Sequence, residues 1–201
     1  MSSGVGLISI YNEDAYEKSL IELFQNLGYM YYYGPDIERD YKNPLYVDDL
    51  NVLYQINNKL DKEAVDKAIE TVQDFGIGSL EDKNNKFMEY LQNGINVNYW
   101  KNGEEKSTHI KLIDFENQGN NAFTVINQWT VEEKEVKRPD IVVFVNGFPL
   151  VVCELKSPSR EDTDTSEAYN QLKKYMQVIP SLFNYNAFCV MSDMSISKEE
   201  Q

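Results

Sequence analysis

Two short apolar runs separated by a turn dominate the last third of the chain. Residues 141–145 and 150–155 are rich in β-branched side chains, and the pair Asn146-Gly147 lies between them. An Asn-Gly pair between two such runs is a strong short-range signal for a β-hairpin, because both residues tolerate a positive φ. We therefore predict two adjacent antiparallel strands here.

The open end of this hairpin carries acidic side chains. If the hairpin closes around residues 146–149, the numbers of facing residues sum to about 293 to 295, which places Asp140 beside Glu154. Glu154 and Lys156 are two residues apart on one strand, so both side chains leave the same face of the sheet. The pattern predicts two carboxylates and one ammonium group close together.

Two carboxylates at this spacing repel each other unless a cation neutralises them. Mg²⁺ prefers hard oxygen ligands and keeps several water molecules, one of which can attack a phosphodiester. Mn²⁺ is an alternative to Mg²⁺. Lys156 is then expected to orient that water or to stabilise charge in the transition state. Acidic and basic residues at this spacing also occur as solvent-exposed charges at the ends of ordinary strands. A purely structural role for these residues therefore stays open.

A helix is predicted from about residue 166 to residue 178. Gln171 and Tyr175 are four residues apart, so they project from one face of it. They are candidates to reach the active lysine or a DNA phosphate, and an ordinary packing helix is the alternative. The apolar stripe at helical spacing consists of Ala168, Leu172, Tyr175, Met176 and Ile179.

Together these motifs resemble the nuclease domain of the R (restriction) subunit of type I restriction enzymes. That family is a branch of the PD-(D/E)xK superfamily with a RecB-like Gln-x-x-x-Tyr motif. The resemblance implies an α/β fold with a restriction-endonuclease-like core, in which helices flank a central mixed β-sheet. It rests on the order and spacing of Arg138-Pro139-Asp140, Asn146-Gly147 with residues 149–152, Glu154-Leu155-Lys156, Gln171 with Tyr175, residues 180–186 and Ser192-Asp193.

The same resemblance implies roles for individual residues. Asp140 and Glu154 are expected to ligate Mg²⁺ together with the backbone carbonyl of Leu155. Gln171 and Tyr175 are expected to orient the attacking water or the scissile phosphate. The substrate implied is double-stranded DNA, cut without sequence preference at this site.

An amphipathic helix is predicted over residues 13–29, ended by Gly28. Members of the family take an acidic metal ligand from such a helix. A helical wheel places Glu17 at the edge of the buried face and Glu22 elsewhere, so Glu17 is the expected third acid and Glu13 its substitute. An edge glutamate can also be a solvated flank. The predicted apolar stripe is Tyr16, Leu20, Leu23, Phe24 and Leu27.

The middle of the chain predicts further helices and strands. Strands in this part are expected to pair with the hairpin, and the first two are separated by a turn at residues 101–103. The predicted helices cover residues 45–60, 61–72 and 84–93, and the predicted strands cover residues 95–99, 107–114 and 121–131.

Length and composition predict one globular domain over residues 1–201. The chain is 42% hydrophobic, lacks an apolar run of membrane-spanning length, and begins without the basic region of a signal peptide. We therefore expect a cytoplasmic location and no membrane partner. Cys153 and Cys189 lie in apolar runs and are expected to be reduced core residues. The single histidine, His109, is interpreted as incidental.

A formal charge of −14 is unfavourable for gripping DNA, because affinity for phosphates normally comes from lysine and arginine. Lys137 and Arg138 remain candidates for local phosphate contact. The family has other domains and subunits that hold DNA: a motor region, a specificity subunit and a modification (methyltransferase) subunit. No P-loop motif occurs here, so ATP would serve only a motor region absent from this chain, which is interpreted as an N-terminal fragment.

The function expected from these observations is the Mg²⁺-dependent endonuclease module of a type I restriction enzyme, acting in restriction-modification defence against foreign DNA. Two alternatives stay open. One is a stand-alone RecB-like repair or junction nuclease. The other is a non-catalytic docking domain with vestigial acids.

Overall fold

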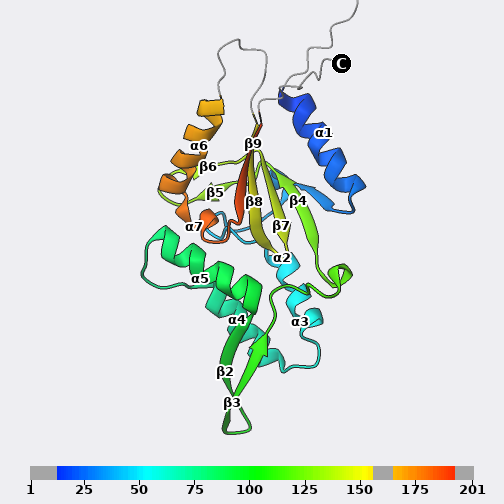
Figure 1. The fold of residues 1–201 in the computed structure, drawn as a ribbon, viewed down its shortest axis with the longest axis vertical. Helices are drawn as coiled ribbons and strands as arrows, with labels where there is room; N and C mark the ends of the chain where they lie inside the picture. Colours follow the sequence, from blue (N-terminus) through cyan, green and yellow to red (C-terminus); the bar gives the residue numbers. More distant parts are fainter. Residues whose placement is uncertain (1–12, 156–164, 193–201) are drawn as a thin grey trace, which may run out of the picture.

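The computed structural model of the chain describes residues 13–155 and 165–192. A five-stranded mixed sheet lies between helices on both faces, and a helical lobe with a long β-ribbon extends from one end (Figure 1). This confirms the predicted α/β fold with a central mixed sheet. The strand order is β1 (Met30–Tyr33), β4 (Phe123–Asn127), β7 (Ile141–Val145), β8 (Phe148–Leu155) and β9 (Phe188–Ser192).

The predicted hairpin is formed by β7 and β8. Its strands are antiparallel, with Val145 facing Phe148 at the turn and Ile141 facing Cys153 near the open end, and a bulge interrupts the register beyond Val143. At the turn, Asn146 and Gly147 have φ values of 52° and 82°. Both positive angles are those of a two-residue hairpin turn, so the turn prediction is confirmed.

Each face of the sheet is covered by one long helix, α1 (Glu13–Asn26) on one side and α6 (Thr165–Val178) on the other (Figure 1). Side chains alternate between the faces along each strand. The face under α1 carries Val125, Ile141, Val143, Cys153 and Leu155. The face under α6 carries Ile126, Val142, Phe144 and Val152, packed against Leu172, Tyr175 and Ile179.

The predicted apolar stripes of both helices need correction. Of the stripe predicted for residues 13–29, Leu23 and Leu27 are 52% and 66% exposed, whereas Ile21 of α1, which the prediction left out, is buried. The helix lies near the edge strand β1, so a narrow line of side chains suffices to cover the sheet, and Tyr16, Leu20 and Phe24 complete it. In α6, Met176 is also exposed, and the rest of its predicted stripe is buried.

The lobe at the other end contains four helices and a separate two-stranded sheet. The predicted helix over residues 45–60 is two short helices, and β2 and β3 pair only with each other. The expectation that these strands join the hairpin was therefore wrong, and of the predicted middle strands only the one containing β4 pairs with β7. Alternate apolar residues of β2, Ile95 and Val97, pack on the helices of this lobe instead. The elements are α2 (Val47–Leu50), α3 (Val52–Ile56), α4 (Lys62–Gln73), α5 (Leu80–Asn93), β2 (Ile95–Lys101) and β3 (Glu104–Ile110).

Shorter elements complete the fold. A second small ribbon precedes the hairpin, and α7 follows α6 directly, because Pro180 cannot extend the preceding helix but suits the first turn of a new one. These elements are β5 (Val131–Glu132), β6 (Val136–Lys137), α7 (Pro180–Phe183) and the 3₁₀ turns η1 (Gly34–Asp36) and η2 (Gln118–Asn120).

The hairpin turn is buried against the lobe. The side chain of Asn146 is fully buried; its oxygen accepts from Ala122 N over 2.8 Å and its amide donates to Leu112 O over 2.8 Å. Tyr46 N donates to Gly147 O over 3.0 Å. A Cβ at Gly147 would lie 2.4 Å from Tyr46 O, so glycine is required there for space as well as for its φ.

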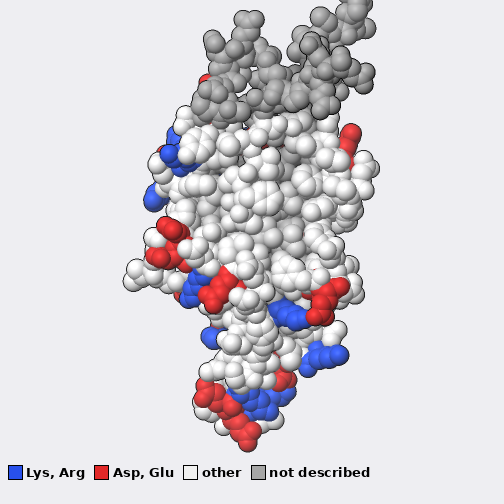
Figure 2. Space-filling model, in the orientation of Figure 1, with Lys and Arg blue, Asp and Glu red and all other residues white. Residues whose placement is uncertain are grey.

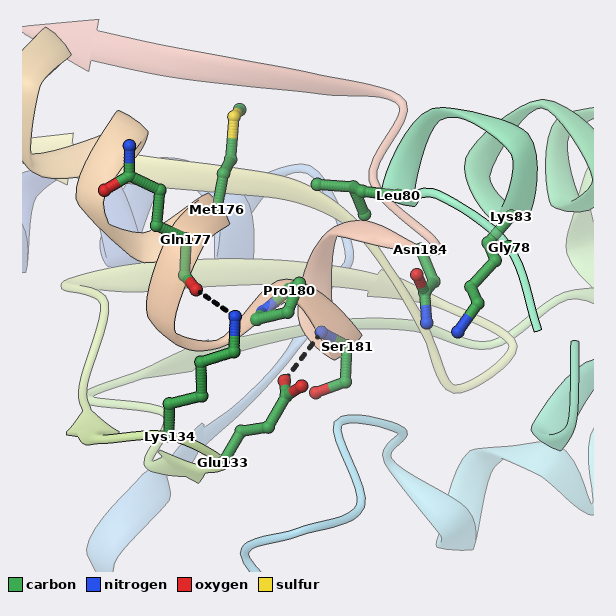
Figure 3. A pocket seen from close by; sticks show the side chains of 10 residues that line it. All are labelled: Gly78, Leu80, Lys83, Glu133, Lys134, Met176, Gln177, Pro180, Ser181 and Asn184. Atoms are coloured by element: carbon green, nitrogen blue, oxygen red, sulfur yellow. Dashed lines mark hydrogen bonds between the residues drawn. The ribbon is translucent and has the colours of Figure 1, made fainter. Parts of the chain in front are cut away.

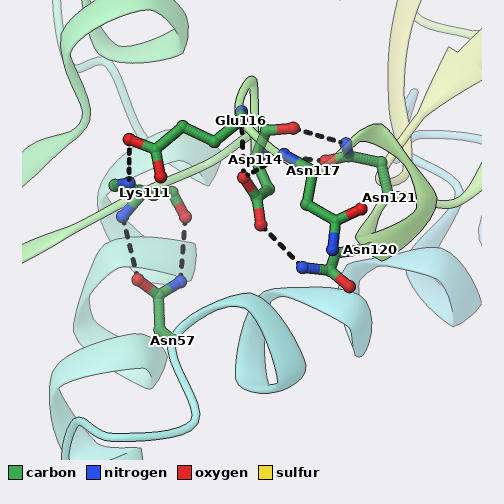
Figure 4. A network of polar contacts seen from close by, with 7 residues as sticks. All are labelled: Asn57, Lys111, Asp114, Glu116, Asn117, Asn120 and Asn121. Atoms are coloured by element: carbon green, nitrogen blue, oxygen red, sulfur yellow. Dashed lines mark hydrogen bonds and ion pairs between the residues drawn. The ribbon is translucent and has the colours of Figure 1, made fainter.

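The loop from β3 to β4 is ordered by its own polar side chains (Figure 4). Asp114 accepts from Asn117 N over 3.0 Å and from Asn120 Nδ2 over 2.7 Å, and these contacts lower the pKa of its carboxyl. Asn57 pins the loop start, because it pairs with both the N–H and the carbonyl of Lys111. This polar cluster is a structural loop brace.

Two further sequence expectations concern the thiols and the membrane. Cys153 is buried, Cys189 is partly buried, and both are free thiols, as predicted. Burial raises the pKa of Cys153 to about 12, so the thiol stays protonated at neutral pH. Among residues 13–155 and 165–192, no helix combines the length and the apolarity that crossing a bilayer requires.

Candidate active site

Asp140 and the end of β8 meet at the open end of the hairpin. Asp140 directly precedes β7, and its Oδ2 accepts a hydrogen bond from the backbone N–H of Leu155 over 2.8 Å. This contact fixes the aspartate beside Glu154, as the predicted register required. The structure therefore brings together the two predicted hairpin acids.

Glu154 is almost fully buried, with 1% of its surface exposed. Its carboxylate lies on the face of the sheet covered by α6, beside the phenol of Tyr175. Burial first, and then the negative charge of Glu154, raise the pKa of Tyr175 well above its usual value. The phenol therefore keeps its proton at neutral pH and is able to donate a hydrogen bond to a neighbouring carboxylate.

Gln171 and Tyr175 meet on α6, one turn apart, as predicted. The Gln171 side-chain amide donates to the Tyr175 hydroxyl over 2.8 Å. Gln171 is exposed, whereas Tyr175 is only 3% exposed. The three side chains thus form a line from solvent to the interior, Gln171 to Tyr175 to Glu154. In this arrangement Tyr175 lies beside the acid and is shielded from solvent.

Glu17 lies on the opposite face of the sheet, on α1. Its Oε1 accepts from Asn127 Nδ2 over 2.6 Å and its Oε2 accepts from Gln128 Nε2 over 3.1 Å. Within the described part of the chain, no three histidine, cysteine, aspartate or glutamate side chains gather as a metal site. Glu17 is therefore not grouped with Asp140 and Glu154.

Sequence reasoning missed Asn127 and Gln128. Asn127 ends β4 and Gln128 follows it. Two neighbouring amide side chains at the end of a buried strand were the sequence feature that could have pointed to them. Gln128 links the acids indirectly, because its N–H donates to Asp140 O over 2.9 Å while its side chain contacts Glu17. The substitute acid, Glu13, begins α1, and its side chain lies outside the described part.

The other residues that the sequence predicted for the site lie away from the paired acids or outside the described residues. Lys137 Nζ lies 2.6 Å from Glu135 Oε2, with Lys174 Nζ 3.9 Å from the same oxygen, and Arg138 is exposed. Lys156 lies outside the described residues, as does Asp193. His109 is exposed and contacts Asn96 through Nδ1 at 2.9 Å, on the distant β2–β3 ribbon.

A cavity of about 450 Å³ opens between α5, the β5–β6 ribbon and α7 (Figure 3). Two pairs of its lining residues are hydrogen-bonded to each other. Lys134 Nζ donates to Gln177 O over 2.9 Å, and Glu133 Oε2 accepts from Ser181 N over 2.9 Å. None of its lining residues is a predicted site residue, so this cavity is separate from the paired acids.

Charged side chains are unevenly distributed on the surface. On the face shown in Figure 2, basic and acidic groups gather on the lobe and its β-ribbon, and a largely uncharged area covers the sheet region. On the lobe the basic groups alternate with acidic ones, and a few further basic groups lie over α6. This agrees with the formal charge of −14, and it offers phosphates no continuous basic surface on that face.

Comparison with known proteins identifies the family. The family model described as the N terminus of the type I restriction enzyme R protein matches residues 10–197. The chain is 35% identical to the HindI endonuclease subunit of Haemophilus influenzae, over 93% of this chain and 19% of that protein. It is also 35% identical to a Methanocaldococcus jannaschii protein provisionally named as the MjaIXP endonuclease subunit, over 90% of this chain and 18% of that protein.

The chain therefore spans about a fifth of the length of these curated relatives. Both relatives bear the name of an endonuclease subunit of a type I restriction enzyme, and the match covers the hairpin acids and α6. By its match over nearly the whole sequence, this chain belongs to the family formed by the N-terminal region of type I restriction enzyme R proteins.

Proposed function

We propose that this chain is the endonuclease module of a type I restriction enzyme and hydrolyses phosphodiester bonds of double-stranded DNA with the help of Mg²⁺. The observation that carries the proposal is the pairing of Asp140 with the end of β8 through the Leu155 N–H, which sets two carboxylates at one end of a buried hairpin. Buried carboxylates of this kind are costly unless they are matched by cations or hydrogen bonds.

The donor atoms suit a hard divalent cation. Asp140 and Glu154 would hold Mg²⁺ with the carbonyl of Leu155, an all-oxygen set of the type that Mg²⁺ or Mn²⁺ prefers. When bound, the cation would offset the negative charge of the two carboxylates and of a phosphodiester. In the same proposal, Lys156 positions the attacking water or offsets charge in the transition state.

Tyr175 and Gln171 support the acid in this proposal. A hydrogen bond from the Tyr175 phenol would fix one orientation of the neighbouring Glu154 carboxylate, and the Gln171 amide holds the phenol in place. Groups that orient a metal-binding carboxylate typically change affinity or activity about 10-fold to 100-fold when they are removed. The pair therefore acts on Glu154, in place of the direct contact with water or phosphate that the sequence suggested.

The parent assembly follows from the same proposal. The relatives carry the name of subunits, and this chain corresponds to about a fifth of their length. We propose that specificity and modification subunits and an ATP-driven motor region hold the DNA and deliver it to these acids, in the cytoplasm. A charge of −14 is compatible with that division of labour, since the module then needs little affinity of its own.

The test is a cleavage assay on the full-length subunit reassembled with its partners. Asp140→Ala or Lys156→Ala should abolish Mg²⁺-dependent cleavage and leave ATP hydrolysis intact. Glu89→Ala, which removes an exposed acid on α5, is the matched control and should cut normally. Retained cleavage in the Asp140 or Lys156 variant would remove the assignment.

Two measurements separate the alternatives. Cleavage by the 201-residue chain without partners at physiological salt would favour a stand-alone RecB-like nuclease. Calorimetric titration with Mg²⁺ or Mn²⁺ addresses the docking alternative, because a chain with vestigial acids would show no binding that depends on Asp140 and Glu154.

A further inference from the structure

The acid on α1 is placed differently from the two hairpin acids. We infer that Glu17 is a positioning residue: with Asn127 and Gln128 it forms a clamp that holds the end of β4, and through it Asp140, instead of ligating the cation. This inference rests on the proposed function, because it concerns how the same site is held in shape. It differs from the third-ligand role that the family resemblance suggested.

The clamp consists of two amides on one carboxylate. Each oxygen of Glu17 accepts one amide hydrogen bond, from Asn127 over 2.6 Å and from Gln128 over 3.1 Å. Asn127 is 5% exposed, and its own oxygen accepts from the Tyr31 hydroxyl over 3.1 Å. Hydrogen bonds from neutral donors to a charged carboxylate, partly shielded from water, are among the stronger ones in proteins. The carboxylate therefore ties α1 to the end of β4, and Asn127 in turn is bonded to β1 through Tyr31.

Gln128 transmits this constraint to Asp140. Its φ of 56° lies in the left-handed region, which is unfavourable for a residue with a side chain, so the surrounding contacts must hold it. One of these contacts is the bond from Gln128 N to Asp140 O at 2.9 Å. Gly34 closes the other side, because a Cβ there would lie 2.6 Å from Gln128 O.

The location of Glu17 argues against direct ligation. The carboxylate of Glu154 lies under α6, whereas Glu17 lies with α1 on the other face. Tyr16, the neighbour of Glu17, bonds Ser192 at the end of β9 over 2.7 Å, so α1 is fastened at both sides of the hairpin end. Helix α1 is thus held against the strands on both sides of the hairpin acids.

The decisive variant is Gln128→Gly in the 201-residue chain. Glycine accepts the positive φ and keeps the N–H that binds Asp140. The variant therefore loses only the side-chain bond from Gln128 to Glu17, and the bond from Asn127 to Glu17 remains. We expect Mn²⁺ affinity, measured by calorimetry, to fall about tenfold. Asn102→Gly is the matched control, because Asn102 also has a φ of 56° but lies at the exposed turn of the β2–β3 ribbon, and it should leave affinity unchanged.

Variants of Glu17 separate positioning from ligation. Glu17→Gln keeps one oxygen as an acceptor, so it should weaken Mn²⁺ binding much less than Asp140→Asn does. Glu17→Ala should cost at least the tenfold expected for Gln128→Gly, because it also removes the bond from Asn127. The double variant should be no weaker than Glu17→Ala alone, because Glu17→Ala already removes the bond from Gln128. A loss for Glu17→Gln as large as that for Asp140→Asn would overturn the inference in favour of direct ligation.

Failure of the proposed function would look different. If the unaltered chain binds no Mn²⁺, the metal site itself is refuted. The clamp is then still tested in metal-free protein by the urea midpoints of the same double-mutant cycle. Shifts smaller in the double variant than the sum of the single shifts support the clamp, and purely additive shifts overturn it.

Discussion

The backbone N–H of Leu155 donates a 2.8 Å hydrogen bond to Oδ2 of Asp140, and this bond joins the start of β7 to the end of β8. A side chain that is held by the neighbouring strand keeps its position without a cation. The pair of hairpin acids is thus built into the fold.

Replacing Tyr175 with phenylalanine should weaken both the fold and the site. The change removes a buried hydroxyl that accepts from Gln171 and lies beside the Glu154 carboxylate. Removing a buried hydroxyl from such a set of polar groups costs about 1 to 3 kcal/mol, and we expect a loss of unfolding free energy in that range by urea denaturation. Tyr169→Phe, on the exposed side of α6, is the control and should change stability little.

The Tyr175→Phe variant should also lower the cleavage activity. Cleavage by the reassembled enzyme should fall about 10-fold to 100-fold, because Glu154 loses its fixed orientation. ATP hydrolysis should not change. Undiminished cleavage together with lower stability would show that Tyr175 is only a packing residue.

Stability should fall in alkaline solution. Burial is the largest cause that raises the pKa of Tyr46, Tyr175 and Tyr185 above the ordinary value of 10.0. The folded state then holds these protons more tightly than the unfolded state, so stability is full below pH 10 and declines as pH rises above it. Urea midpoints between pH 8 and pH 11 measure this, read together with tyrosinate absorbance near 295 nm at the upper end. A flat profile would contradict the prediction.

Substituting alanine for Gly34 should destabilise the end of β4. The new Cβ would lie 2.6 Å and 2.7 Å from the carbonyl oxygens of Gln128 and Asn127, so backbone must move. Overpacking of this kind typically costs about 1 to 3 kcal/mol, which thermal unfolding would detect. Gly78→Ala is the control, because its nearest neighbour would be 3.6 Å away, and it should be neutral or slightly stabilising.

Asn146→Gly should be strongly destabilising even though it suits the positive φ. It deletes buried side-chain bonds to Ala122, Leu112 and Asn121, at 2.8, 2.8 and 2.9 Å. We expect a loss of about 3 kcal/mol in unfolding free energy. Asn102→Gly, with the same change of residue at an exposed turn, should stay within about 0.5 kcal/mol of the unaltered chain. Equal effects would refute the role assigned to the buried bonds.

The hairpin at the centre of the sheet could be predicted because its signals are local. An Asn-Gly turn between β-branched runs specifies the hairpin, and helical periodicity specifies α4, α5 and α6. Strand β1 was missed because Met30–Tyr33 has only four residues and carries exposed tyrosines at the sheet edge. The position of β2 and β3 depends on their packing against α4. The alternation of apolar and polar residues along these strands does not determine which strand each one pairs with.

The candidate site divides in the same way. Asp140 and Glu154 were predictable because a short turn fixes which residues face each other, and Gln171 and Tyr175 because a helical turn does so. The contacts of Glu17 with Asn127 and Gln128 span more than a hundred residues of sequence, and nothing local encodes them. The burial of Tyr175 against Glu154 likewise depends on how α6 docks on the sheet.

The buried turn of the hairpin also bears on the order in which the chain matures during synthesis. The groups that receive Asn146 and Gly147, at Tyr46, Leu112, Asn121 and Ala122, all lie earlier in the sequence. They have left the ribosome before the hairpin does. We expect the acid-bearing hairpin to dock onto a lobe that is already assembled, so that its strands spend little time as exposed, aggregation-prone β-segments.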